Sequence, residues 1–386
     1  MSDVMISDAI RYVGVDDTAI DLFESQYPVP NGVSYNAYVI LDEKVAVMDT
    51  VDRRFADEWM ANLEKVLAGR RPDYLVIHHL EPDHAGSIGL LAEKYPEMTL
   101  VASAKALTML GKYFTCTNPT QAMAEGSTLS LGQHTLTFVM APMVHWPEVM
   151  VSYESAEKTL FSADGFGTFG ALCRQRPWLE EARRYYYNIV GKYGAQVQAL
   201  LKKAAALDIQ RICPLHGPVL TEDLGKYITY YDLWSRWQVE DEDGVLVAYA
   251  SIHGNTARAA KLMAEILTEK GAKVTVRDLC REDQSLAVED AFRCRRMVAM
   301  ASTYDGGIFP AMEHFLSHLR DKTYRCRTVA LVENGSWAPA AGKIMTAAFQ
   351  AMKDITLCEK YYSLCGAVKE TDKAGLEALA DELLSK

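Results

Sequence analysis

The C-terminal part of the chain alternates apolar runs with helical stretches, and this alternation restricts the fold more than any other feature. The apolar runs are VLVAYA (245–250), KVTVRDL (273–279), RMVAMAS (296–302), TVALVEN (328–334) and ITLCEKYYSL (355–364). Stretches such as PAMEHFLSHLRD and KAGLEALADELLSK have the spacing typical of amphipathic helices. Five apolar strands joined by helical crossovers predict a parallel, doubly wound α/β sheet.

The N-terminal part follows a different pattern, in which short strands and helices are mixed. TLVAS (99–103), HTLTFVMAPM (134–143) and KTLFSAD (158–164) are rich in β-branched or aromatic residues, and each precedes a turn marked by Gly, Pro or Asp. The segment YYDLWSRWQVEDEDG (230–244) ends in four acids and a glycine, and we interpret it as the linker. The sequence therefore predicts two domains, 1–240 and 245–386.

Composition excludes several classes of partner. The 386 residues carry a formal charge of −11 and no basic run, so neither nucleic acid nor an anionic membrane is an expected partner. No stretch approaches the roughly 18–20 apolar residues that span a bilayer, and the first residues lack the pattern of a leader. We expect a cytoplasmic protein. The eight cysteines form no C-x-x-C pair, which argues against an appended cysteine-ligated metal ribbon.

Metal-type ligands gather in IHHLEPDHAG (77–86), which follows the predicted buried strand DYLVIHHL. Side chains at i and i+2 of an extended segment lie on the same side, so His79 and Glu81 can converge on one ion. Asp83 and His84 follow the turn at Pro82 and could serve a second ion. His78 should point the opposite way, as a packed or supporting residue.

Three further ligand-type residues occur where a predicted strand meets a loop marked by Gly or Pro. They are His145 in APMVHWP, Asp164 in LFSADGFG and His216 in ICPLHGP. One such histidine alone is more often structural than functional. The packed cluster at 79–84, followed by these three, instead predicts a dinuclear metal site.

The order H-x-E-x-D-H, followed by His, Asp and His, resembles the dinuclear sites of the metallo-β-lactamase-like proteins. The zinc hydrolases of that superfamily carry His at the position of Glu81, and a carboxylate there favours iron. In this respect the chain resembles the flavodiiron proteins, also called A-type flavoproteins. The resemblance implies an N-terminal αββα sandwich. It also implies two ferrous or ferric ions bridged by an oxo or hydroxo group.

The same resemblance assigns the ligands residue by residue. His79, Glu81 and His145 would hold one iron, and Asp83, His84 and His216 the other, with Asp164 as the bridging carboxylate. Some members of the family do not use the residue that matches His84 as a ligand. No catalytic residue beyond the metal ligands is predicted, because no Ser or Cys has a visible partner set.

The first apolar run of the C-terminal part leads into SIHGNT (251–256), a hydroxyl-rich turn that opens a helix. Such a turn offers backbone N–H groups and the positive end of the helix dipole to a phosphate. It matches neither G-x-x-x-x-G-K-[ST] nor G-x-G-x-x-G. It resembles the FMN phosphate loop of flavodoxins, which implies a flavodoxin-like domain.

Two further strand ends, STYDGG (302–307) and ENGSWAP (333–339), match the loops that flank the isoalloxazine ring in that family. Trp337 is the first candidate to stack on the ring and Tyr304 the second. Many relatives have Pro between the residues that match Ser302 and Thr303, and this chain does not. The predicted FMN contacts are Ser251, Ile252, His253, Gly254, Asn255, Thr256, Ser302, Thr303, Tyr304, Asp305, Gly306, Gly307, Asn334, Gly335, Ser336 and Trp337.

The resemblance implies an oxidoreductase that reduces O₂ to water, NO to N₂O, or both, for detoxification in the cytoplasm of an anaerobe. Two ferrous ions and one reduced flavin hold four electrons, enough to take O₂ to two waters. The ligands do not choose between the two gases. The implied electron donor is a separate rubredoxin, or alternatively a reduced deazaflavin (coenzyme F420). The implied assembly is a head-to-tail homodimer, or a dimer of such dimers, which pairs the flavin of one chain with the irons of the other.

Two other interpretations remain open at this point. The chain could be a zinc-dependent hydrolase of the lactamase or glyoxalase type fused to a flavodoxin carrier, against which Glu81 argues. It could also be an electron-transfer or redox-sensing module with a vestigial metal site, against which the complete ligand set argues.

Overall fold

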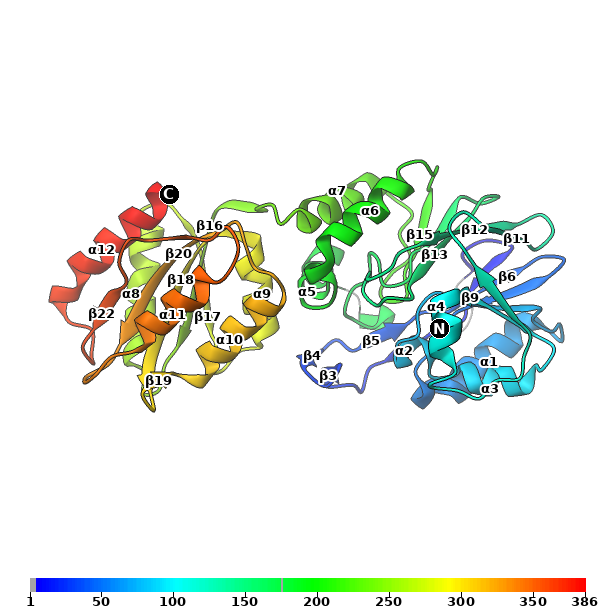
Figure 1. The fold of residues 1–386 in the computed structure, drawn as a ribbon, viewed down its shortest axis with the longest axis horizontal. Coiled ribbons are helices and arrows are strands. Elements are labelled where there is room, and N and C mark those ends of the chain that lie inside the picture. The colour runs from blue at the N-terminus through cyan, green and yellow to red at the C-terminus, as the bar shows by residue number, and fades with distance from the viewer. Residues whose placement is uncertain (1–4, 175) are drawn as a thin grey trace. The chain divides into compact units, whose positions relative to one another are not determined.

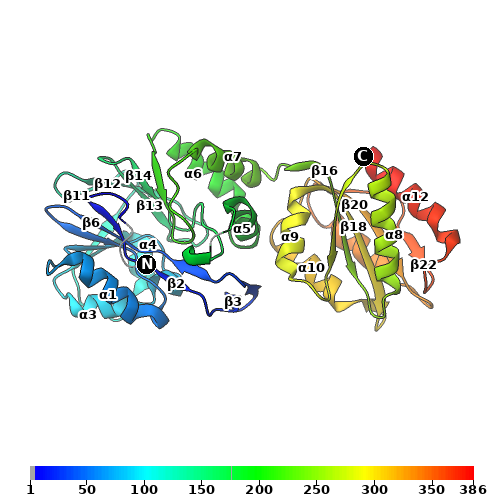
Figure 2. The same cartoon turned by 180° about the vertical axis from the view of Figure 1, so that it is seen from behind.

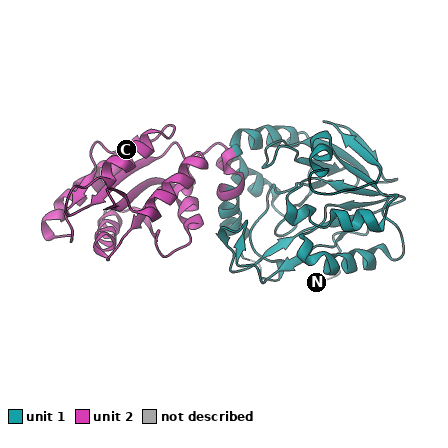
Figure 3. Cartoon of the chain, turned by 60° about the horizontal axis from the view of Figure 1, so that its bottom comes forward, with its two compact units in different colours: residues 1–186, 193–232 teal, residues 187–192, 233–386 magenta. Residues whose placement is uncertain are grey.

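The computed structural model describes residues 5–174 and 176–386. The first four residues, which belong to the segment inspected for a leader, lie outside this described part. The chain forms two compact units, one of Met1–Tyr186 with Tyr193–Asp232 and one of Tyr187–Lys192 with Leu233–Lys386 (Figure 3). The predicted domain limits, 1–240 and 245–386, stay a prediction. Within the described residues, no helix is both long and apolar enough to cross a bilayer.

The first unit contains two main sheets. Its strands are β1 (Ile10–Tyr12), β2 (Val15–Asp17), β3 (Leu22–Phe23), β4 (Tyr27–Pro28), β5 (Val33–Tyr35), β6 (Tyr38–Leu41), β7 (Val45–Met48), β8 (Tyr74–Ile77), β9 (Thr99–Ser103), β10 (Thr120–Met123), β11 (Thr128–Ser130), β12 (Thr135–Met140), β13 (Met150–Glu154), β14 (Thr159–Phe161) and β15 (Arg211–Cys213). One sheet has the order β1-β6-β7-β8-β9-β10 and the other β11-β12-β13-β14-β15. Two small ribbons, β2-β5 and β3-β4, complete the unit.

Seven α-helices lie among the described residues of this unit, and the longer ones flank the sheets. They are α1 (Ala56–Leu67), α2 (Pro82–Ala85), α3 (Ile88–Lys94), α4 (Ala104–Leu110), α5 (Trp178–Tyr185), α6 (Gly194–Ala204) and α7 (Leu224–Ser235). Figure 1 shows α1 and α3 beside the first sheet, and α6 and α7 over the second. The predicted αββα sandwich is confirmed.

The core of the first unit lies between its two sheets. Alternate residues of the first sheet, such as Tyr38 and Ile40, pack in one buried cluster with Leu136 and Phe138 of the second. A strand places every second side chain on the same face, so this alternation buries one face of each sheet against the other. The buried faces fix the strands, and thereby the loops at their ends.

The second unit is built on one parallel sheet with the order β17-β16-β18-β20-β21, in which β22 also pairs with β20 and the short β19 pairs with β18. Its strands are β16 (Asp241–Ala250), β17 (Lys273–Asp278), β18 (Cys294–Tyr304), β19 (Gly307–Ile308), β20 (Thr328–Asn334), β21 (Thr356–Leu357) and β22 (Tyr362–Leu364). Its helices are α8 (Asn255–Glu269), α9 (Gln284–Arg293), α10 (Pro310–Asp321), α11 (Ala341–Gln350) and α12 (Glu370–Ser385). Figure 2 shows α8 and α12 on one side of the sheet and α9 and α10 on the other. The predicted doubly wound sheet is confirmed.

The predicted linker, 230–244, is wrong over most of its length. Helix α7 continues to Ser235, and β16 already begins at Asp241. The helix continues because Tyr231 and Trp234 are buried. The acidic residues are held as strand because Asp241 pairs with Arg293 at 3.2 Å and Glu242 with Arg295 at 2.7 Å. Only residues 236–240 connect the two elements.

The fifth predicted strand, 355–364, is divided into β21 and β22. Both pieces pair with β20, where Val329 lies opposite Leu357 and Val332 lies opposite Tyr362. The connecting loop holds the charged Glu359, which is exposed. The break accommodates the extra residues of this segment, which is longer than the part of β20 that it faces.

Candidate metal centre and flavin site

The metal-type residues of the first unit come from loops at the same edge of its sheets. Strands β14 and β15 are parallel, and β12 and β14 both pair antiparallel with β13. The carboxyl ends of β12, β14 and β15 therefore point the same way. His145, Asp164 and His216 each follow one of these strands, while His79 and Glu81 follow β8.

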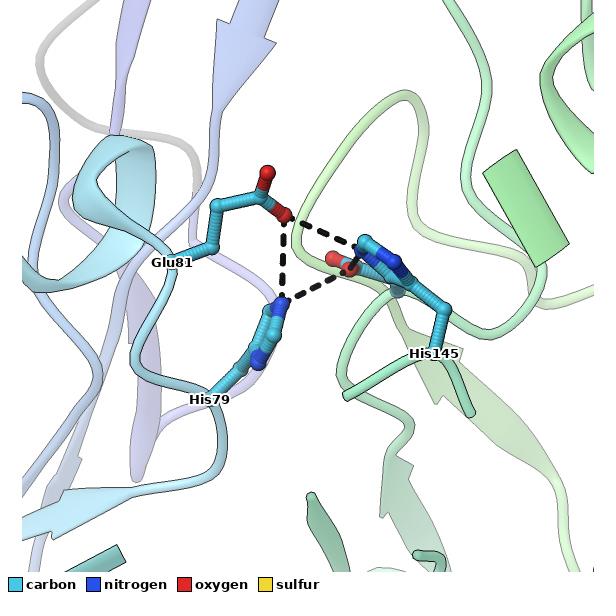
Figure 4. A group of neighbouring side chains, drawn as sticks. His79, Glu81 and His145 are labelled. Atoms are coloured by element: carbon cyan, nitrogen blue, oxygen red, sulfur yellow. Dashed lines mark hydrogen bonds and ion pairs between the residues drawn. The ribbon is translucent and has the colours of Figure 1, made fainter. Parts of the chain in front are cut away.

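The first group of ligand atoms comprises His79, Glu81, His145 and Asp164. Oε2 of Glu81 lies 3.2 Å from Nε2 of His79 and 3.0 Å from Nε2 of His145. Oδ2 of Asp164 lies 3.4 Å from the former nitrogen and 3.2 Å from the latter. Figure 4 shows the labelled side chains pointing toward one another. The structure thus brings together the four residues predicted for one ion and its bridge.

The second group comprises Asp83, His84 and His216. The Nε2 atoms of the two histidines lie 3.0 Å apart, and Oδ2 of Asp83 lies 3.3 Å from His84 Nε2 and 3.2 Å from His216 Nε2. The other oxygen of Asp164, Oδ1, is 3.4 Å from His84 Nε2. Asp164 therefore presents one carboxylate oxygen to each group.

These separations fit two metal ions. An ion held at about 2.1 Å by octahedral ligands separates neighbouring ligand atoms by about 3.0 Å. Both carboxylate oxygens of Asp83 and of Asp164 are buried without a hydrogen-bond partner among the described residues. A buried carboxylate without hydrogen bonds is stable only beside a positive charge. The mixture of carboxylates and imidazoles suits iron, for which Glu81 supplies a hard oxygen donor.

Electrostatics agrees with this interpretation. Burial opposes charge on Asp164, yet His79, His145 and His84 hold the pKa of its carboxyl well below the usual value. Burial also opposes charge on His145, but the adjacent carboxylates of Asp164 and Glu81 raise its pKa to about 9. Without metal, protonated imidazoles therefore balance the negative charge of the buried carboxylates. Bound metal cations would balance the same charge.

Supporting residues orient the first group. Glu148, which the sequence analysis missed, is buried, and its Oε1 lies 2.9 Å from His79 Nδ1 and accepts the N–H of Leu80 at 3.0 Å. His79 is thereby left with Nε2 free for a metal. Glu148 lies three residues after His145, and that proximity was the only available sequence signal.

His78 supports the surrounding structure through hydrogen bonds and supplies no ligand atom. Its Nδ1 lies 2.5 Å from Asp49 Oδ2 and its Nε2 lies 2.8 Å from Ser152 Oγ. In the second group, Nδ1 of His216 lies 2.8 Å from the carbonyl oxygen of Ser34, so its Nε2 also faces the centre in the tautomer that can bind metal.

In the second unit, the ends of β16, β18 and β20 surround a hollow of about 410 Å³. The turn that opens α8 is held by Gly254, which adopts the left-handed φ of 87° and donates its N–H to Ser251 Oγ at 3.1 Å. Thr256 Oγ1 lies 2.9 Å from Ser302 Oγ, which ties the turn to the end of β18. The free N–H groups at the start of this 15-residue helix suit a phosphate.

Most of the predicted FMN residues line this hollow. Gly254, Tyr304 and Gly307 do not, whereas Ala338 and Gly366 line it without having been predicted. Tyr304 packs edge-on against Phe309 with ring centroids 5.5 Å apart. The predicted residues in the lining are Ser251, Ile252, His253, Asn255, Thr256, Ser302, Thr303, Asp305, Gly306, Asn334, Gly335, Ser336 and Trp337.

Trp337 is 82% exposed, so one face of this ring is available to a planar ligand. Thr303 instead uses its hydroxyl to accept the N–H groups of Ala340 and Ala341, which holds the loop before α11. Gly366 exchanges two hydrogen bonds with the side chain of Asn334, and it belongs to the loop after β22 that the sequence analysis did not consider.

Comparison with known proteins identifies both units. The profile of the ODP family beta lactamases matches residues 33–217, and that of the flavodoxins matches residues 247–381. A nitric oxide reductase of Moorella thermoacetica is 27% identical over 361 residues, which cover 91% of this chain and 90% of that protein.

Solved structures share the fold over almost the whole chain. The rubredoxin oxygen:oxidoreductase of the anaerobe Desulfovibrio gigas has a TM-score of 0.92 and 26% identity, and the match covers 99% of this chain and 98% of that one. The flavodiiron protein of Giardia intestinalis has a TM-score of 0.94 and 24% identity, and the match covers 99% and 96%.

Proposed function

We propose that this chain, which belongs to the flavodiiron proteins, reduces O₂ to water, NO to N₂O, or both, at the cluster centred on Asp164. One observation carries the proposal. Two groups of metal-type ligands face the two oxygens of a single buried carboxylate, in a chain whose second unit is of the flavodoxin type.

The cofactors of this chain are FMN and two iron ions. When bound, FMN would supply electrons, and the two iron ions would supply a redox-active centre that the gas can reach. His79, Glu81 and His145 would hold one ion. Asp83, His84 and His216 would hold the other, and Asp164 would bridge the two.

The protein's own residues prepare this centre. Glu148 fixes the orientation of the His79 ring, and Ser34 does the same for His216. Burial of His79, His84, Asp164 and His216 keeps bulk water from the ligand atoms. Glu81 and Asp83 are the partly exposed ligands, with 14% and 12% of their side chains accessible. We infer that substrate approaches the open coordination positions of the metals.

The alternative of a zinc hydrolase fused to a flavin carrier is less well supported. The oxygen donor of Glu81 disfavours zinc, and two proteins that match over most of the chain are named a nitric oxide reductase and a rubredoxin oxygen:oxidoreductase. The test is to load the purified protein with FMN and iron, reduce it without oxygen, and mix it with O₂ and separately with NO in a stopped-flow instrument. We expect rapid reoxidation by at least one gas. Two zinc ions per chain together with thioesterase activity would contradict the proposal.

We further propose a head-to-tail homodimer, or a dimer of such dimers, in which the flavin of one chain serves the metals of the other. The metal ligands and the flavin hollow belong to separate units of the chain, which supports a shared site between chains. Co-expression of an Asp164→Ala chain with a Gly254→Asp chain tests this. Random pairing restores about one quarter of the native activity if the chains cooperate head to tail. No activity in the mixture would contradict the arrangement.

The proposal also covers the electron donor and the cellular compartment of the protein. We propose a separate rubredoxin as donor, with a reduced deazaflavin as the second candidate, in the cytoplasm. The name of the Desulfovibrio gigas relative includes rubredoxin, which supports the first choice. To choose between the two donors, each is supplied without oxygen and the rate of flavin reduction is measured.

A further inference from the structure

A cavity of about 320 Å³ lies in the first unit, between the second sheet and the helices α6 and α7. Its walls come from β12, β13, β14 and β15 on one side and from the two helices on the other, which Figure 1 shows over that sheet. The lining is almost wholly aliphatic or aromatic. It comprises Val139, Val144, Val151, Leu160, Ser162, Gly165, Phe166, Val197, Leu200, Leu201, Ala204, Ala205, Leu207, Ile209, Ile212, Ile228 and Tyr231.

The two hydroxyl groups of this lining both have hydrogen-bond partners in the protein. Ser162 Oγ donates to the carbonyl oxygen of Gly165 at 2.7 Å, and Tyr231 Oη accepts the N–H of Phe166 at 2.6 Å. A buried water needs two to four polar partners, and apolar cavities of about 150 Å³ stay dry and take up xenon. The cavity therefore suits a small apolar molecule better than water.

The inner wall of the cavity is adjacent in the chain to the metal ligands. Val144 directly precedes His145, and Gly165 and Phe166 directly follow Asp164. Consecutive Cα atoms are at most about 3.8 Å apart, so the same loops carry both a metal ligand and part of the cavity wall. The Phe166 ring packs on Tyr231 with centroids 4.2 Å apart, which holds this part of the wall in place.

The outer end of the cavity is accessible. Ile228 of α7 is 38% exposed, and Ala205, which follows α6, is also exposed. Residues further inside, such as Val151 and Ile212, are buried. The cavity thus extends from the surface between α6 and α7 toward the loops that hold His145 and Asp164.

We propose that this cavity takes up the neutral diatomic gas on which the enzyme acts, O₂ or NO, and supplies it to the metal centre. The inference rests on the proposed function. Both gases are small and apolar, so they partition from water into a space with apolar walls. A larger amphiphile would find no unpaired polar partner in the side chains of the lining, since those of Ser162 and Tyr231 are engaged.

Xenon tests the uptake independently of any activity. Crystals of the purified protein are pressurised with xenon, and anomalous scattering locates the gas. We expect xenon between Val151, Leu160 and Ile212. A cavity without xenon, or one filled by a co-purified lipid identified by mass spectrometry, would overturn the proposal.

A matched pair of variants tests the supply of gas. Ala204→Phe places a ring at the cavity, whereas Ala199→Phe makes the same change at an exposed position of α6 outside the lining. We expect Ala204→Phe to lower the second-order rate constant for reoxidation by O₂ and by NO about three- to tenfold, with the rate of flavin reduction and the iron and FMN contents unchanged. Equal rates in the two variants would contradict the proposal.

The outcomes separate this inference from the proposed function. If the unaltered, fully loaded enzyme consumes neither gas, the proposed function fails and the supply role fails with it, while the xenon experiment still reports the gas affinity of the cavity. If the enzyme is active but xenon avoids the cavity, only the present inference fails. Should Ala204→Phe not fold, xenon binding to the unaltered protein decides.

Discussion

The two candidate sites of this protein are built in opposite ways. The metal centre consists of charged and imidazole side chains that converge from loops far apart in the sequence, and most of them are buried. The flavin hollow consists of turns at the ends of neighbouring parallel strands, with small residues and backbone groups at its edge. Metal binding should therefore depend on single side chains, whereas FMN binding should depend on the conformation of the backbone.

The largest effect is expected at the carboxylate shared by the two groups. Asp164→Ala removes the oxygens that face both, so we expect loss of iron and a fall in gas consumption of at least about 100-fold. The FMN content should not change. Asp164→Asn is the control of equal size, and it should lose iron as well because the charge is absent. Elemental analysis measures the iron content. If either variant kept two irons per chain, metal binding would not depend on this single side chain.

The second effect concerns the choice of metal. Glu81→His replaces the oxygen donor by nitrogen, and we expect zinc to displace iron when both are supplied, with activity reduced about 10- to 100-fold. Glu81→Asp keeps the carboxylate and should keep the preference for iron. An unchanged ratio of iron to zinc in the His variant would show that this donor does not govern the choice.

The third effect tests the residue that orients His79. Glu148→Gln keeps the shape of the side chain but removes its charge, and we expect iron affinity to fall about tenfold. Titration with ferrous iron under anaerobic conditions measures this change. Equal affinity in the variant and the native protein would mean that Glu148 serves the backbone of Leu80 alone.

The fourth effect belongs to the flavin site. Gly254 has φ of 87°, where an alanine costs about 1 kcal/mol, so Gly254→Ala should weaken FMN binding about fivefold. Gly271→Ala is the matched control, because Gly271 has φ of 91° but follows the C-terminal end of α8, whereas Gly254 caps the end that opens on the hollow. Both variants should lose similar stability, and only the first should lose FMN. Iron content should stay constant in both.

The smallest effect is a dependence of stability on pH in the metal-free protein. The pKa of His145 is raised from 6.5 to about 9 by Asp164 and Glu81, against the effect of burial. The stabilisation from its positive charge is therefore fully present below pH 6.5 and is lost as the pH rises through about 9. We expect the metal-free first unit to melt about 5 to 10 °C lower at pH 9.5 than at pH 6.5. The iron-loaded protein should not show this loss in calorimetry, since metal then holds the imidazole.

Much of the metal centre could be predicted because its ligands occupy short, regular positions. The spacing of His79 and Glu81 and the strand-end positions of His145, Asp164 and His216 are visible in the sequence. Glu148 could not be identified in this way, because its contact with His79 joins residues 69 positions apart. Its role depends on how β8 and the loop after β12 come together in the fold.

The errors at the linker and in the fifth strand have a shared cause. A run of acids looks like solvated linker in the sequence, but the arginines that pair with Asp241 and Glu242 lie more than fifty residues away. Similarly, the apolar residues on both sides of Glu359 look like one strand until the register with β20 is known. In both segments, tertiary pairing overrides the local pattern.

The most direct test of the metal centre is anomalous diffraction at the iron and zinc edges from crystals of protein supplied with equal amounts of both metals. We predict two iron peaks, one on each side of the Asp164 carboxylate, and no zinc there. Zinc at both positions, or a centre without metal between these side chains, would contradict the assignment.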